Sequence, residues 1–215
     1  MIAPSDFIAA VQSGEIARVQ RALAADPSLA SARDENGVSV IMHAFYRRQN
    51  EIAAVLLGSK AAPDIFEATA AGRLDRVSEI LRADPVSLAQ RSADGFTALH
   101  FAAFFNFPES ARTLIHRGAD VSAVASNAMK VSPLHSAATS RSHDVVRQLL
   151  AAGAPVNARQ HGGWTALHAA AANGDAEMVR DLLAQGADLN AANDEGKTAL
   201  GIAQAKGHAE VVKLL

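Results

Sequence analysis

One short motif returns along the chain at almost constant intervals, and this periodicity constrains the fold more than any other feature. Leucine recurs inside the motif at positions 99, 134, 167 and 200, so its successive steps are nearly equal in length. A period of about 33 residues is typical of a solenoid, in which each repeat packs only against its neighbours. The 215 residues are therefore expected to form one elongated array rather than one or two globular domains.

Each interval has the pattern of two short helices and a polar loop. In the last full interval, an alanine-rich stretch after Thr165 runs to Gly174, and the apolar stripe of Met178, Val179 and Leu182 follows. Apolar residues at helical spacing indicate one buried helix face, and the glycine marks the turn between two helices. The polar residues between one helix pair and the next predict a projecting loop, which we call a finger.

The first half of the chain departs from this pattern. Residues 58–63 are too few for a finger, and the step is clearly shorter than the later ones if Ile41 and Ile65 are equivalent anchors. The flanking helices keep their apolar stripes, so we expect one continuous helical stack with a gap in its row of fingers. This gap should leave Tyr46 and Arg47 more open to a ligand than their counterparts elsewhere.

Charge and composition argue against several classes of partner. The net charge is −2 and no basic block occurs, which disfavours nucleic acid. No uninterrupted apolar stretch is long enough to span a membrane, and the first residues lack the pattern of a signal peptide. The chain has no cysteine, which agrees with a reducing compartment. We therefore expect a cytoplasmic protein without nucleic-acid or membrane partners.

Two signatures recur in register between residue 94 and the end of the chain. The first opens the helix pairs as Thr97-Ala98-Leu99-His100, Ser132-Pro133-Leu134-His135 and Thr165-Ala166-Leu167-His168. The second is Gly118-Ala119-Asp120-Val121-Ser122, Gly153-Ala154-Pro155-Val156-Asn157 and Gly186-Ala187-Asp188-Leu189-Asn190. In both, the chain resembles the ankyrin repeat family, strongly over 94–215 and more loosely over 5–92. The resemblance implies an all-α solenoid of stacked helix-turn-helix repeats with β-hairpin fingers, and a role in protein binding.

We expect a single ankyrin repeat domain over residues 1–215. Its repeats are predicted at about 5–33, 34–63, 64–92, 93–124, 125–159, 160–192 and 193–215. The resemblance brings no catalytic residues, and the sequence lacks the nucleophile, phosphate-loop and zinc-protease motifs of common enzymes. We therefore expect no enzymatic activity and no cofactor.

His100, His135 and His168 recur once per repeat, so a metal site has to be weighed against a structural role. No carboxylate or thiolate completes a ligand set at a usable local spacing. The family resemblance implies that these histidines bond the local backbone and the neighbouring threonine. A hydrogen bond repeated in every layer explains the pattern better, and we expect no metal.

Large side chains gather where the family resemblance places the concave face, although the chain is only 5% aromatic. These positions follow the turn glycine or end the first helix of a pair. Exposed aromatic side chains there would mark an interaction site, with a filled core as the alternative for Phe104, Phe105 and Trp164. The predicted partner-binding residues are Glu35, Tyr46, Arg47, Phe96, Phe104, Phe105, Met129, Val131, His161, Trp164 and Asn173.

The resulting hypothesis is a monomeric, non-catalytic module that binds a protein or peptide on its concave face. Two alternatives remain open at this point. The chain could be a regulatory ankyrin region of a larger protein or enzyme, or a structural spacer or designed repeat protein without a natural partner. If substitution of Phe96 and Trp164 left every interaction of the protein intact, the spacer alternative would be favoured.

Overall fold

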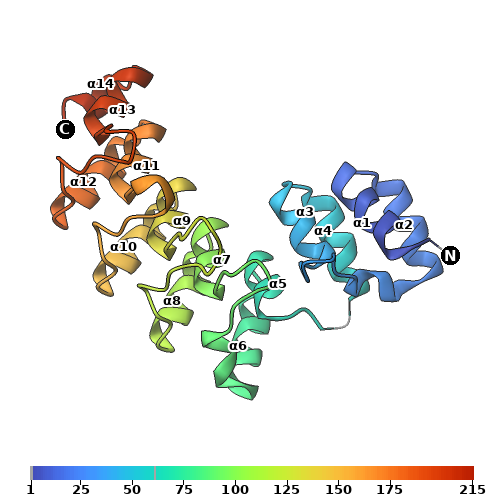
Figure 1. The fold of residues 1–215 in the computed structure, drawn as a ribbon. Helices are drawn as coiled ribbons and strands as arrows, with labels where there is room; N and C mark the ends of the chain where they lie inside the picture. The colour runs from blue at the N-terminus through green and yellow to red at the C-terminus, as the bar shows by residue number, and fades with distance from the viewer. Residues whose placement is uncertain (1, 61) are drawn as a thin grey trace.

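The computed structural model of the protein describes residues 2–60 and 62–215, in which helices follow one another in pairs (Figure 1). The pairs are α1 (Pro4–Ser13) with α2 (Ile16–Ala25), α3 (Val40–Tyr46) with α4 (Asn50–Ser59), α5 (Ile65–Ala70) with α6 (Leu74–Ala83), α7 (Ala98–Phe104) with α8 (Pro108–His116), α9 (Pro133–Thr139) with α10 (His143–Ala151), α11 (Ala166–Asn173) with α12 (Ala176–Ala184), and α13 (Ala199–Lys206) with α14 (Ala209–Val212). Three 3-10 helices lie between pairs, at Pro27–Ser31, Pro85–Ala89 and His161–Gly163. The predicted all-α class is confirmed. Every helix of the described chain is too short or too polar to cross a bilayer.

The repeated motif sets the start of the first helix in a pair. At the start of α11, the backbone N–H of Thr165 donates to His168 Nδ1 at 3.1 Å, while Thr165 Oγ1 accepts from the backbone N–H of His168. This capping box satisfies two backbone N–H groups near the start of the helix. Gly174 ends α11 with a φ of 68°, a left-handed conformation that glycine adopts without steric cost.

The pairs stack into two layers, one of odd-numbered and one of even-numbered helices. In the C-terminal part, α7, α9, α11 and α13 pack in series, as do α8, α10, α12 and α14. Leu99, Leu134 and Leu167 are each only 1% exposed, which agrees with their role as repeat anchors. Buried alanines such as Ala137 and Ala170 let the helices of neighbouring repeats approach closely.

The fingers are tight turns rather than the extended β-hairpins that the resemblance implied. Within the described residues, only the isolated bridges Arg33–Ser39 and Ala192–Thr198 pair as strands. Side chains form hydrogen bonds with finger backbone groups that a hairpin would pair. For example, Asn193 Oδ1 accepts the N–H groups of Glu195 and Lys197 at 3.0 and 2.9 Å. Such side-chain bonds compete with a strand ladder and keep each finger short.

The regular stack is interrupted between α4 and α5. One buried core spans residues 7–57 and a second spans 65–211, and a small cluster of Met42, Ala70 and Phe101 lies between them. Helices α3 and α5 contact each other, whereas α4 and α6 do not pack closely in the described chain (Figure 1). The predicted continuous stack therefore holds for the odd-numbered layer but is wrong for the even-numbered layer.

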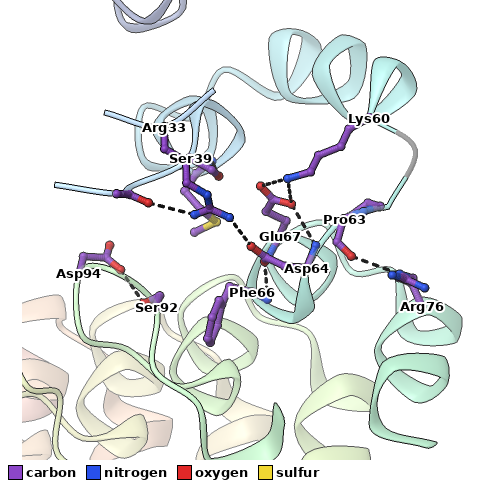
Figure 2. A network of polar contacts seen from close by, with 12 residues as sticks. Arg33, Ser39, Lys60, Pro63, Asp64, Phe66, Glu67, Arg76, Ser92 and Asp94 are labelled. Atoms are coloured by element: carbon purple, nitrogen blue, oxygen red, sulfur yellow. Dashed lines mark hydrogen bonds and ion pairs between the residues drawn. The ribbon is translucent and has the colours of Figure 1, made fainter. Parts of the chain in front are cut away.

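Polar contacts hold this joint in place of a finger (Figure 2). The Lys60 ammonium donates to both carboxylate oxygens of Glu67, at 2.8 and 2.7 Å, and Glu67 is fully buried. The Arg33 guanidinium donates to Asp64 at 2.9 Å. Helix α4 runs to Ser59 and α5 begins after Asp64, so the described residues of 58–63 form no finger, as their spacing predicts. Residue 61 lies outside the described chain.

Candidate protein-binding groove

Tyr46 lies at the end of α3, directly beside the joint. Its hydroxyl donates to the carboxylate of Asp94, which belongs to the finger before α7, so this bond crosses from one core to the other. Burial raises the pKa of Tyr46 above its usual range, and the Asp94 carboxylate raises it further. The phenol therefore keeps its proton and remains a donor, while the residue as a whole is 39% exposed.

Phe101 is the centre of an aromatic cluster beneath Tyr46. Its ring centroid lies 5.7 Å from that of Phe96 and 5.9 Å from that of Phe66, both in edge-to-face arrangements. Phe105 packs 6.4 Å from Phe101 on another side. Phe101 is only 2% exposed, so it forms a buried floor, and edge-to-face contacts of this kind stabilise its position.

A pocket of about 360 Å³ opens above this floor, and we call it the apolar pocket. Its most exposed large apolar members are Phe104 at 42% and Met129 at 57%. The lining residues are Tyr46, Phe96, His100, Phe101, Phe104, Met129, Val131, His135, Ser136, Thr139 and Gln160. A pocket of this size and composition suits a bulky apolar side chain.

A second pocket of about 820 Å³ adjoins the first, and we call it the arginine pocket. The pockets share Tyr46, Phe104 and Thr139, so together they form one groove. Residues on both sides of the joint line it, from Asn50, Ala53 and Leu57 of α4 to Arg73, Phe105 and Phe107. Arg48 and Arg73 supply its charge, and its described lining contains no carboxylate.

Six of the predicted partner-binding residues converge on this groove. They are Tyr46, Phe96, Phe104, Phe105, Met129 and Val131. Val131 is only 8% exposed, so it can act only as part of the pocket wall. The alternative that Phe104 and Phe105 simply fill the core is wrong for Phe104, which stays exposed, and holds only in part for Phe105, which is half-buried.

The other five predicted residues do not line either pocket. Glu35, Arg47 and His161 are exposed but line neither pocket, and Trp164 is half-buried beside His168. The Asn173 amide donates to the carbonyls of Ala138 and Thr139 at 3.1 and 3.3 Å, at the end of α9. Asn173 therefore has a structural role, because these bonds link one repeat to the next.

The two arginines of the groove, Arg48 and Arg73, were not among the predicted partner-binding residues. A signal for Arg48 was present in the turn between the helices of each pair. Glycine occupies that turn at 14, 72, 174 and 207, whereas the second pair has Arg48, and the fourth and fifth pairs have Asn106 and Arg141. No comparable signal marks Arg73, because its place in the groove depends on how the two cores meet.

The repeated histidines have the structural role that the resemblance implied. His100 Nδ1 accepts the backbone N–H of Thr97 at 3.2 Å, and its Nε2 lies 3.0 Å from the carbonyl of Val131. His135 and His168 repeat both contacts one and two layers on. Burial lowers the pKa of His100 to about 4, so its ring is neutral near pH 7. The described residues contain no group of three or more potential metal ligands.

Comparison with known proteins agrees with these features. The family model for ankyrin repeats in three copies matches residues 65–160 and, in a second match, 134–215. The chain is 27% identical over 163 residues to ankyrin repeat protein FPV014 of fowlpox virus, covering 71% of this chain and 36% of that protein. It is 40% identical over 81 residues to a mouse B-cell lymphoma 3 protein homolog, covering 38% of this chain and 18% of that protein.

The chain thus spans about a third or less of these relatives. The matches to the family model cover more than half of the chain, and they include every regular helix pair from α7 onward. Capping boxes closed by a histidine recur in the same register at α7, α9 and α11. This chain therefore belongs to the ankyrin repeat family.

Proposed function

We propose that this chain is a non-catalytic module that binds a protein or peptide in the groove formed by the apolar and arginine pockets. Ankyrin repeats are generally protein-interaction modules, which supports the general role. The observation that supports this surface is the gathering of Tyr46, Phe104 and Met129 around two connected pockets. Exposed apolar side chains that gather at one place mark an interaction site more often than scattered ones do.

Preorganisation supports tight binding at this surface. Phe101 packs against Phe96, Phe105 packs against Phe104, and the Tyr46 hydroxyl is fixed by Asp94. A partner that enters the groove orders few side chains of the module, which limits the entropy lost on association. A buried aromatic anchor at the centre of an interface is where most binding energy is usually concentrated.

A phage-displayed library of random linear peptides, selected on the whole chain, tests this proposal. We expect selected peptides to lose about tenfold or more in affinity for the Phe104→Ser variant, as at an interface hot spot. Val86→Ser is the matched control, since Val86 is 71% exposed and lines neither pocket. Failure to select any peptide, or equal binding by Phe104→Ser, would contradict the proposal.

A further inference from the structure

The arginine pocket contains cations that the protein itself does not neutralise. Arg48 and Arg73 are exposed and form no ion pair with any described residue, unlike Arg76, Arg112 and Arg147 on the outer helices. Apolar and aromatic residues, including Phe107, line the same pocket. A charge beside apolar walls interacts with an opposite charge more strongly than it would in bulk water.

Arg48 also occupies a backbone conformation that does not suit arginine. Its φ is 57°, in the left-handed region where glycine stands in the corresponding turns of four other pairs. Arg141 has the same conformation at 58°, but its guanidinium donates to the carbonyl of Asn173 and so contributes to the stack. The Arg48 side chain has no such hydrogen bond in the described chain. A strained residue without a structural contact suggests a role in binding.

The neutral polar groups of the arginine pocket also suit an anionic ligand. Asn50, Asn106, Thr139 and Ser140 line it beside the arginines, and amide N–H and hydroxyl groups can donate to a carboxylate. Asp94 lies at the edge of the groove, but the Tyr46 hydroxyl already engages its carboxylate. The lining therefore favours an anion over a cation.

We propose that the partner presents an extended peptide segment in which a bulky apolar side chain stands close to an aspartate or glutamate. The apolar side chain fills the apolar pocket, and the carboxylate binds Arg48 and Arg73 in the arginine pocket. The shared wall of Tyr46 and Phe104 makes the pockets neighbours, so one segment reaches both. This inference rests on the proposed function and adds the chemistry of the partner to it.

The peptides selected from the random library provide the test. We expect them to be enriched in aspartate or glutamate near leucine, phenylalanine or tryptophan. The Arg48→Gln/Arg73→Gln double variant should bind them about tenfold or more weakly, and replacing the peptide's acid by its amide should cost a similar factor. In the double variant, the same acid-to-amide change should have little further effect, because its partner is already gone.

Arg82→Gln serves as the matched control, since Arg82 is an exposed arginine of α6 that lines neither pocket. Thermal unfolding followed by circular dichroism checks that each variant is folded. Peptides that need Phe104 but carry no acid, or that bind the double variant unchanged, would overturn this inference and leave the proposed function standing. If no peptide is selected, or if Phe104→Ser binds normally, the proposed function fails and this inference fails with it.

Discussion

The joints between regular repeats differ from the joint at residues 60–64 in what links the layers. Between regular repeats, a buried histidine reaches from its capping box to a carbonyl of the next repeat, as His135 does to Trp164 at 3.2 Å. At the start of α5, Glu67 closes the capping box instead, and its carboxylate turns back to Lys60. The histidine bond therefore links a repeat to the one that follows it, whereas the Glu67 carboxylate links α5 to Lys60 in the linker that precedes it.

This difference explains why the groove lies where it does. In a regular stack, each even-numbered helix is covered by the next one, as α10 is by α12. At the irregular joint, α6 does not cover α4, and residues of α4 such as Ala53 and Leu57 line the arginine pocket instead. The arginine pocket therefore lies where the even-numbered layer is interrupted.

The regular region should depend most on its buried anchors. Leu167 is 1% exposed between repeats, whereas Leu214 lies beyond α14 and remains partly exposed. We expect Leu167→Ala to lower the free energy of unfolding by about 2–5 kcal/mol and Leu214→Ala by clearly less. Chemical denaturation of the two variants measures both values. Equal losses in the two variants would show that a leucine in the middle of the stack contributes no more to stability than one at its end.

The irregular joint should depend on its ion pair. Lys60→Met removes the ammonium and leaves the buried Glu67 carboxylate without its charged partner. We expect a loss of about 3 kcal/mol in unfolding free energy, the lower part of the usual range because Lys60 keeps slight solvent access. The double variant Lys60→Met/Glu67→Met should recover much of this loss, since neither charge is then stranded. A double variant as unstable as the single one would argue against a buried pair.

The histidine ties should make the regular region sensitive to acid. The folded state holds His100 at a pKa of about 4, below the ordinary value of 6.5, so the unfolded chain binds the proton more readily between these values. Stability should therefore fall as pH drops from about 6.5 towards 4, by roughly 1–3 kcal/mol from this residue. In His100→Gln, the difference in unfolding free energy between pH 7 and pH 5 should shrink. If the change in unfolding free energy between pH 7 and pH 5 is the same with and without His100, this residue is not the source of the acid sensitivity.

The smallest effect concerns the two turns on either side of the joint. Arg48→Gly should raise the unfolding free energy by about 1 kcal/mol or less, because it relieves a left-handed arginine. Gly72→Ala should do the opposite, since its Cβ would lie 2.5 Å from Cε1 of Phe107. Thermal denaturation compares the two variants. If Arg48→Gly is destabilised, the arginine supports the fold and its strain is no argument for binding.

Local patterns accounted for most of the architecture. The recurrence of Thr165 and His168 with their equivalents predicted the helix starts, and the anchor leucines predicted the buried face. These features act within one repeat or between neighbours, so a sequence period reveals them. The same reasoning located the missing finger at 58–63, because a turn of that kind needs more residues than the segment contains.

The groove was only partly accessible from the sequence. Tyr46, Phe96 and Phe104 stood out because large aromatic groups are rare in this chain and occupied recurrent positions. Trp164 met the same criterion, yet it packs beside His168 and lines neither pocket. Periodicity gives the position of a residue within its repeat, but it does not say whether the neighbouring repeat leaves that position open.

The family, the helix pairs, the anchor leucines and the position of the interruption all follow from the order of residues along the chain. The three-dimensional arrangement was needed to show that the interruption splits the core, leaves α4 uncovered by α6, and brings Arg48 and Arg73 to one pocket. The physical reason is that these outcomes depend on the relative placement of two cores. That placement is set by long-range contacts such as Tyr46 with Asp94, which no local spacing encodes.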